Sequence, residues 1–155
     1  MTATLTAPRA TLDYGYYGGL LSIGSELHEA DRENYTEGDC YLLAKELHLL
    51  GLGELVIVTR AGLPEKGRSW THMAVRTPEG YILDADGLNE PGITLQNYGD
   101  AYGNQAIIHP TDLEGYAELA GDQATSIFEG DYTRGIALEL QAWLTKVPPL
   151  KPLAN

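Results

Sequence analysis

The chain has 155 residues, the size of one domain, and its 43% hydrophobic and 21% charged residues are typical of a globular protein. The net charge of −12 argues against direct binding to nucleic acid, which requires clustered Lys and Arg. No apolar run approaches the roughly 18 residues of a membrane helix, and the single cysteine, Cys40, fits a reducing compartment; we therefore expect a cytoplasmic protein without membrane contact.

We expect one α+β domain over residues 13–147, with a short extension at each end. Residues 1–12 lack the apolar core of a secretory signal and predict a flexible arm. Residues 148–155, PPLKPLAN, predict an extended Pro-rich tail, because consecutive prolines cannot continue a helix.

Little regular structure is expected in the segment before Cys40. Residues 14–19, YGYYGG, predict an irregular stretch. Residues 20–30, LLSIGSELHEA, predict a short helix that Gly24 weakens. The polar residues 31–39 predict a loop.

The strongest helical pattern of the chain covers residues 40–50, CYLLAKELHLL, and begins at the cysteine. Thr36 and Asp39 have the three-residue spacing of a capping box, and either can be the N-cap. Gly51 suits the position after the helix end. One helix face carries the apolar residues Cys40, Leu43, Ala44, Leu47 and Leu50.

The rest of the chain alternates strands and helices. The apolar run in residues 54–60 predicts a buried strand, and residues 61–69 a loop. Residues 105–109 predict a strand, and residues 113–120 and 133–145 predict helices.

Residues 70–87 predict a β-hairpin whose strands are THMAVR and YILDA. The turn Pro78-Glu79-Gly80 suits a three-residue loop that pairs Thr77 with Tyr81. In this register His72 lies opposite Asp86 and Ala74 opposite Asp84. His72, Asp84 and Asp86 therefore project from one face of the hairpin, whereas a two-residue loop would place both aspartates on the other face.

These residues suggest nucleophilic thiol chemistry. The N-terminus of a helix favours a thiolate at Cys40, and its N–H groups can stabilise an oxyanion. His72 would pair with the thiolate and protonate the leaving group, and Asp84 or Asp86 would orient the imidazole. We expect the three groups to converge at an accessible cleft.

The segment GDCYLLAKELH resembles the nucleophile helix of papain-like enzymes. The order of helix-Cys, strand-His and strand-Asp over residues 34–90 is similar to the core of transglutaminase-like enzymes, arylamine N-acetyltransferases and bacterial cell-wall endopeptidases. The resemblance implies a papain-like (transglutaminase-like) α+β core, in which the nucleophile helix packs on an antiparallel β-sheet. It also implies a peptidase, amidase, deamidase or acyltransferase acting on a peptide, protein or amide.

The same resemblance assigns two further roles. Asn34 stands six residues before Cys40, where papain-like enzymes carry an oxyanion-hole Gln. The pattern of an Asp followed three residues later by a Gly favours Asp84 as the third member of the triad, whereas direct opposition to His72 favours Asp86. We select Asp84.

Other interpretations of the sequence require no catalysis. The acidic charge also suits a non-enzymatic binding or inhibitor protein that mimics nucleic acid and occupies a basic protein partner. A third possibility is an inactive papain-like scaffold. We expect His28 to be exposed, and His48 and His109 to have packing or structural roles. We expect no metal or cofactor: the one Cys and four His lack clustered zinc-ligand spacing, and residues 84–90 lack the spacing of a calcium loop.

Overall fold

A computed structural model describes residues 13–60, 70–99, 106–120 and 130–153 of the chain. The arm predicted for residues 1–12 and the loop predicted for 61–69 lie outside the described residues. Within the described ranges, no helix has the length and apolar character needed to cross a membrane.

The fold is α+β and is built on a seven-stranded sheet in which every neighbouring pair of strands is antiparallel. The strand order is β1-β2-β6-β5-β4-β3-β7. The strands are β1 (Asp13–Tyr17), β2 (Leu20–Gly24), β3 (Glu54–Arg60), β4 (Trp70–Arg76), β5 (Ile82–Asp84), β6 (Gly87–Asn89) and β7 (Ala106–Pro110).

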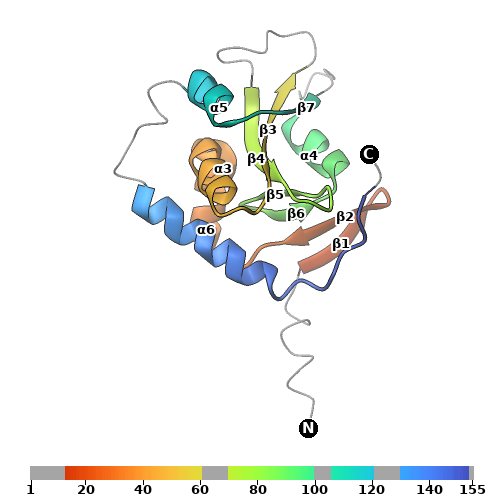
Figure 1. Cartoon of the computed structure of the whole chain (residues 1–155). Coiled ribbons are helices and arrows are strands. Elements are labelled where there is room, and N and C mark those ends of the chain that lie inside the picture. Colours follow the sequence, from red (N-terminus) through yellow and green to blue (C-terminus); the bar gives the residue numbers. More distant parts are fainter. Residues whose placement is uncertain (1–12, 61–69, 100–105, 121–129, 154–155) are drawn as a thin grey trace.

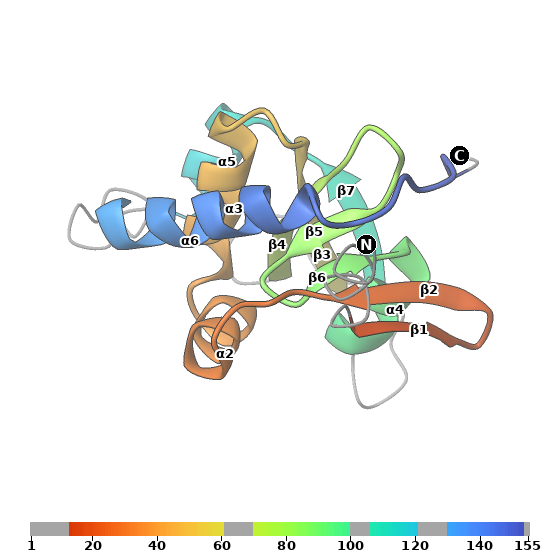
Figure 2. The ribbon, with the colours of Figure 1, turned by 90° about the horizontal axis from the view of Figure 1, so that it is seen from below.

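Helices lie on both faces of this sheet (Figure 1). The described helices are α2 (Glu29–Glu37), α3 (Cys40–Leu49), α4 (Pro91–Tyr98), α5 (Leu113–Ala120) and α6 (Gly130–Leu144). Helix α3 packs against β4 and is contacted by α5 and α6, whereas α4 packs against β2, β6 and β7. Figure 2 shows α6 running alongside α3, away from α4.

The alternation of side chains along the strands separates two apolar layers. Met73 and Val75 of β4 join α3, α5 and α6 in the larger core, which contains Cys40. Ala74 belongs to a smaller apolar cluster with Val56 and Ile82. His72 has the same strand parity as Ala74, so its side chain starts on the face of β4 opposite to α3.

The segment before Cys40 corrects three predictions. Residues 14–19 and 20–30 contain the strands β1 and β2 in place of an irregular stretch and a helix, and residues 31–39 contain most of α2 in place of a loop. Gly18 and Gly19 have φ values of 60° and 82°, which suits the tight turn that joins β1 to β2.

Alternating burial accounts for strand β2, and a capped N-terminus accounts for helix α2. Along β2, Leu21 and Ile23 are buried and their neighbours are only partly buried, because successive side chains face opposite sides of the sheet and one side packs on the core. His28 is the N-cap of helix α2, and its side chain accepts a hydrogen bond from the Ala30 N–H. The acidic residues Glu29 and Asp31 in its first turn complement the helix dipole.

The predictions after Cys40 agree closely with the structure. Helix α3 and strand β3 have nearly the predicted bounds, β7 and α5 also match, and α6 begins three residues earlier than predicted, at Gly130. The hairpin register is confirmed, since Val75 pairs with Leu83 and Arg76 with Ile82. The Thr77 N–H donates to the Tyr81 carbonyl at 2.8 Å, and Gly80 has a φ of 100°.

The residues after α6 run back along this hairpin. The Leu153 N–H donates to the Glu79 carbonyl at 2.8 Å, and the Tyr81 hydroxyl donates to the Lys151 carbonyl at 2.9 Å. The predicted extended tail is therefore fixed to the turn between β4 and β5.

Gly87 is the residue at which β5 turns into β6, and a side chain there is expected to destabilise the fold. Its φ is 129°, and an added Cβ would lie 2.0 Å from the Ile23 carbonyl oxygen. We expect Gly87→Ala to lower the free energy of unfolding by at least about 2 kcal/mol in urea titrations, because strain and a backbone clash act together.

Gly18→Ala is the matched control for this substitution. Gly18 also has a positive φ, 60°, but no atom lies within 4 Å of its added Cβ. Gly18→Ala should lower the free energy of unfolding by about 1 kcal/mol, the cost of the left-handed conformation alone. Equal losses for the two variants would show that Gly87 is not sterically required.

Candidate active site

The N-terminus of α3 places Cys40 in the first turn of a buried helix. Asp39 occupies the N-cap position without a side-chain hydrogen bond, and its carbonyl accepts the Leu42 N–H at 3.0 Å. Thr36 belongs to α2 and donates to the Arg32 carbonyl, so the predicted Thr36 capping box is wrong. The first N–H groups of a helix have no acceptor within the helix and point toward its N-terminal end.

His72 and Asp84 form a buried hydrogen-bonded pair. The imidazole Nε2 lies 2.8 Å from Asp84 Oδ2, and the two residues are only 0% and 2% exposed. Asp84 Oδ1 accepts the Asp86 backbone N–H at 2.9 Å. Each carboxylate oxygen therefore has a donor, which fixes the carboxylate and through it the plane of the ring.

Of the two aspartates predicted as alternatives, Asp84 is the one that contacts the histidine. The strand pairing between β4 and β5 ends at Val75 and Leu83, and the chain then turns so that Asp84 pairs with Gly87 of β6. Asp86 lies in this turn and does not face His72 across the hairpin. Asp84 reaches the ring diagonally from the same face.

Cys40 acts on the other side of the same imidazole. Burial tends to lower the pKa of His72, but the hydrogen bond with Asp84, the nearby Cys40 thiol and the negative charges of both residues outweigh it and raise the pKa to about 9. Nε2 is engaged with Asp84, whereas Nδ1 is buried and has no hydrogen-bond partner in the described structure.

This ring orientation is the reverse of the serine protease arrangement, in which Nδ1 bonds the aspartate and Nε2 the nucleophile. The chemistry is equivalent, because either nitrogen can exchange a proton with the nucleophile while the other is held. When Asp84 accepts the hydrogen bond from Nε2, the second proton of the imidazolium lies on Nδ1, the nitrogen that can exchange it with a thiolate.

Tyr98 covers the imidazole from α4. The two rings are stacked, with centroids 3.7 Å apart and planes inclined by 4°. The Thr71 hydroxyl donates to the Tyr98 carbonyl at 3.1 Å and ties this helix end to β4. Sequence reasoning missed both Tyr98 and α4, although Pro91 at the first position of the helix is a recognisable start signal.

The predicted oxyanion residue lies outside this buried cluster. Asn34 is an exposed residue of α2, and its backbone carbonyl accepts the N–H groups of Gly38 and Asp39. The structure thus brings His72 and Asp84 together, places Cys40 where its charge acts on His72, and leaves the Asn34 side chain at the surface.

The remaining histidines make contacts that support the fold. His28 caps α2, His48 Nδ1 lies 2.9 Å from the Gly53 carbonyl, and His109 Nε2 lies 3.0 Å from the Thr59 hydroxyl. Among the described residues, no three His, Cys, Asp or Glu are grouped so that they could hold a metal ion.

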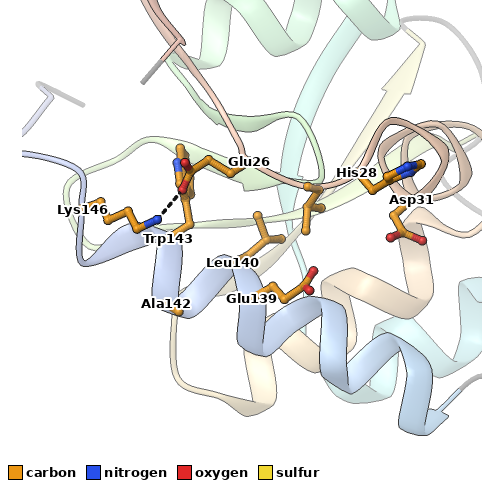
Figure 3. A pocket seen from close by; sticks show the side chains of 9 residues that line it. Glu26, His28, Asp31, Glu139, Leu140, Ala142, Trp143 and Lys146 are labelled. Carbon is orange, nitrogen blue, oxygen red and sulfur yellow. Dashed lines mark hydrogen bonds and ion pairs between the residues drawn. The ribbon is translucent and has the colours of Figure 1, made fainter. Parts of the chain in front are cut away.

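Cys40 does not lie in the accessible cleft that the sequence predicts, since the residue is only 2% exposed. A pocket of about 490 Å³ lies between α6 and the start of α2 (Figure 3). This pocket and three others on the described surface are lined by residues outside the triad. The sulfur is therefore not directly open to a substrate in this structure.

Comparison with known proteins identifies no relative of this chain. No family model matches the chain, and no curated protein or solved structure is significantly similar to it.

The pKa of His72 can be measured directly. A histidine whose pKa is raised on folding stabilises the protein fully below its unfolded value, near 6.5, and that contribution is lost as the pH rises through about 9. We expect the His72 ring signals to titrate near pH 9 in NMR spectra. Asp84→Asn and Cys40→Ala should each shift this titration to lower pH, and an unshifted midpoint in both variants would contradict the proposed contacts.

Asp86 provides a second test, in which the charged form is the one that the fold disfavours. Burial and the nearby Asp84 charge raise the pKa of Asp86 to about 6, although Arg32 and His72 oppose the shift. Its ionisation therefore weakens the fold as the pH rises from 3.8 through about 6.

Asp86→Asn should increase the free energy of unfolding at pH 7 on the order of 1 kcal/mol, since partial exposure reduces the effect. The gain should vanish below pH 4, where both side chains are neutral. Asp131→Asn, at an exposed position in the first turn of α6, should show no gain. A gain for Asp86→Asn that does not depend on pH would contradict the ionisation effect.

Proposed function

We propose that this protein is a thiol-dependent acyl-transfer enzyme, a peptidase, amidase or deamidase, with Cys40, His72 and Asp84 as its catalytic triad. The observation that carries the proposal is one imidazole held by a buried aspartate through Nε2 and influenced by the Cys40 thiol on its other side. A nucleophile, a base and an orienting carboxylate in this order form the general pattern of covalent catalysis.

The proposed reaction has two halves. In the first, the Cys40 thiolate, whose proton is held on His72 Nδ1, attacks the carbonyl carbon of an amide. A C–S bond forms and the carbonyl electron pair moves to oxygen. When the oxyanion collapses, the C–N bond breaks and the imidazolium protonates the leaving amine, which leaves a thioester on Cys40.

In the second half, His72 accepts a proton from water, and the resulting hydroxide attacks the thioester carbon. The C–S bond breaks, the carboxylic acid is released, and the pair of Cys40 thiolate and His72 imidazolium is restored. An amine in place of water would give acyl transfer by the same steps. All proton transfers use groups of this chain, so the proposal requires no cofactor or metal.

The chain order of the triad supports a papain-like, transglutaminase-like core as the finer description of the α+β fold. Cys40 starts a helix that packs on β4, and His72 and Asp84 lie on successive antiparallel strands. The proposed substrate is a peptide, protein or amide. The net charge of −12 favours a substrate or protein partner that carries positive charge.

One observation favours a second candidate, an inactive scaffold of the same fold. Cys40 is 2% exposed, and buried cysteines are commonly inert members of a core. In that case the protein would act only by binding, for example through its acidic surface. Access to the sulfur therefore distinguishes the two candidates.

Iodoacetamide labelling tests the activated thiol. Cys40 should be alkylated below pH 8 faster than the same thiol in unfolded protein, and His72→Ala should reduce that rate at least tenfold, because the imidazole no longer stabilises the thiolate. Alkylation can be followed by intact mass at several pH values, with circular dichroism to confirm that each variant is folded.

His48→Ala is the matched control, since His48 lies near the other end of α3 and bonds the Gly53 carbonyl. It should leave the alkylation rate unchanged. If the alkylation rate follows the titration of an ordinary thiol in both the wild type and His72→Ala, the proposed enzymatic function is refuted. A folded protein that resists labelling at every pH would identify the inactive scaffold.

A further inference from the structure

A buried tyrosine of α5 lies over the first turn of α3. Tyr116 is 2% exposed, and its ring centroid is 6.4 Å from that of Tyr41, the residue after the nucleophile. Both tyrosines belong to the same core cluster as Cys40. Helices α5 and α3 lie side by side in both views of the ribbon (Figures 1 and 2) and contact each other.

The Tyr116 hydroxyl has no hydrogen-bond partner in the described structure. Leaving a buried hydroxyl unsatisfied costs about 1–3 kcal/mol, so such groups are rare and often mark a functional site. His72 Nδ1 is a second buried polar atom without a conventional partner. Cys40 influences both of these residues, so the two unsatisfied atoms belong to the surroundings of one sulfur.

The phenol is within electrostatic reach of the thiol. Burial is the largest cause that raises the pKa of Tyr116, followed by Tyr41 and then by the Cys40 charge, which acts more strongly than the Glu46 charge. A phenol with a raised pKa stays protonated at neutral pH. It can therefore only gain by donating its hydrogen to an acceptor that arrives beside Cys40.

We propose that the Tyr116 hydroxyl, together with the Cys40 backbone N–H, forms the oxyanion hole of this site. The inference rests on the proposed acyl-transfer function. It replaces the predicted Asn34 side chain, which is exposed on α2, with a buried donor from the opposite side of α3.

In the acylation step the Cys40 sulfur forms a bond to the carbonyl carbon, and the carbonyl π electrons move to oxygen. That oxygen becomes an acceptor for the unpaired Tyr116 O–H and for the Cys40 N–H. When the intermediate collapses, the electron pair returns to form the carbonyl and the leaving group departs. The donor that lacks a partner in the resting enzyme thus gains one only in the transition state, which is the condition for catalysis.

Two reagents separate this role from activation of the thiol. p-Nitrophenyl acetate acetylates a thiolate through a tetrahedral oxyanion and releases p-nitrophenolate. Iodoacetamide alkylates the same thiolate by displacement of iodide at a saturated carbon, without an oxyanion. Both probes are small, so the ratio of their rates corrects for changes in access to Cys40.

Tyr116→Phe removes only the hydroxyl oxygen and should leave the fold intact or slightly more stable, because no hydrogen bond is lost. We expect this variant to acetylate about 100-fold more slowly than the wild type, as for the loss of one oxyanion donor, with an unchanged alkylation rate. Tyr81→Phe is the control. It removes a hydroxyl that donates to the Lys151 carbonyl, and should leave both rates unchanged.

Two outcomes overturn the role of Tyr116 and leave the enzyme standing. Acetylation of Tyr116→Phe at the wild-type rate would show that the hydroxyl does not contact the oxyanion. A parallel fall of both rates would show that Tyr116 acts on access or on the thiolate. If wild-type Cys40 is acetylated and alkylated no faster than the unfolded thiol, the acyl-transfer function itself fails, and the oxyanion hole fails with it.

Discussion

The hydrogen bond between His72 and Asp84 is the constraint to which the surrounding structure is adapted. Two groups that can carry charge are held in a sheet interior, which costs free energy unless their geometry and remaining hydrogen bonds are nearly complete. The carboxylate meets this condition with a donor on each oxygen, one of them the Asp86 N–H. The β4–β5 register and the turn at Gly87 both serve to place this carboxylate.

Hydrogen bonding is less complete around the imidazole and around the start of α3. Tyr98 stacks on the imidazole and Tyr116 covers the start of α3, but the ring Nδ1 and the Tyr116 hydroxyl are buried without conventional partners. A sequence selected for stability alone would fill such positions with apolar groups. Local stability is commonly sacrificed where a binding or catalytic function requires it, and here the charge of the single cysteine acts on both His72 and Tyr116.

Local signals in the sequence predicted the elements that position the triad. The helical periodicity after Cys40 and the Pro-Glu-Gly turn determine their structure within a few residues, so α3 and the hairpin register were predictable. Strand β2 was not, because it is stabilised by pairing with β6, more than 60 residues along the chain. Tyr98 and Tyr116 were missed for the same reason, since tertiary packing alone brings them to the site. Their roles in catalysis, and that of the triad, remain predictions.

The residues that follow α6 lie against the hairpin that carries His72 and Asp84. Lys151 and Leu153 hydrogen-bond the turn between β4 and β5, and that turn sets which residues face each other along the hairpin. A truncation before Lys151 would remove both hydrogen bonds and expose the backbone of this turn to solvent.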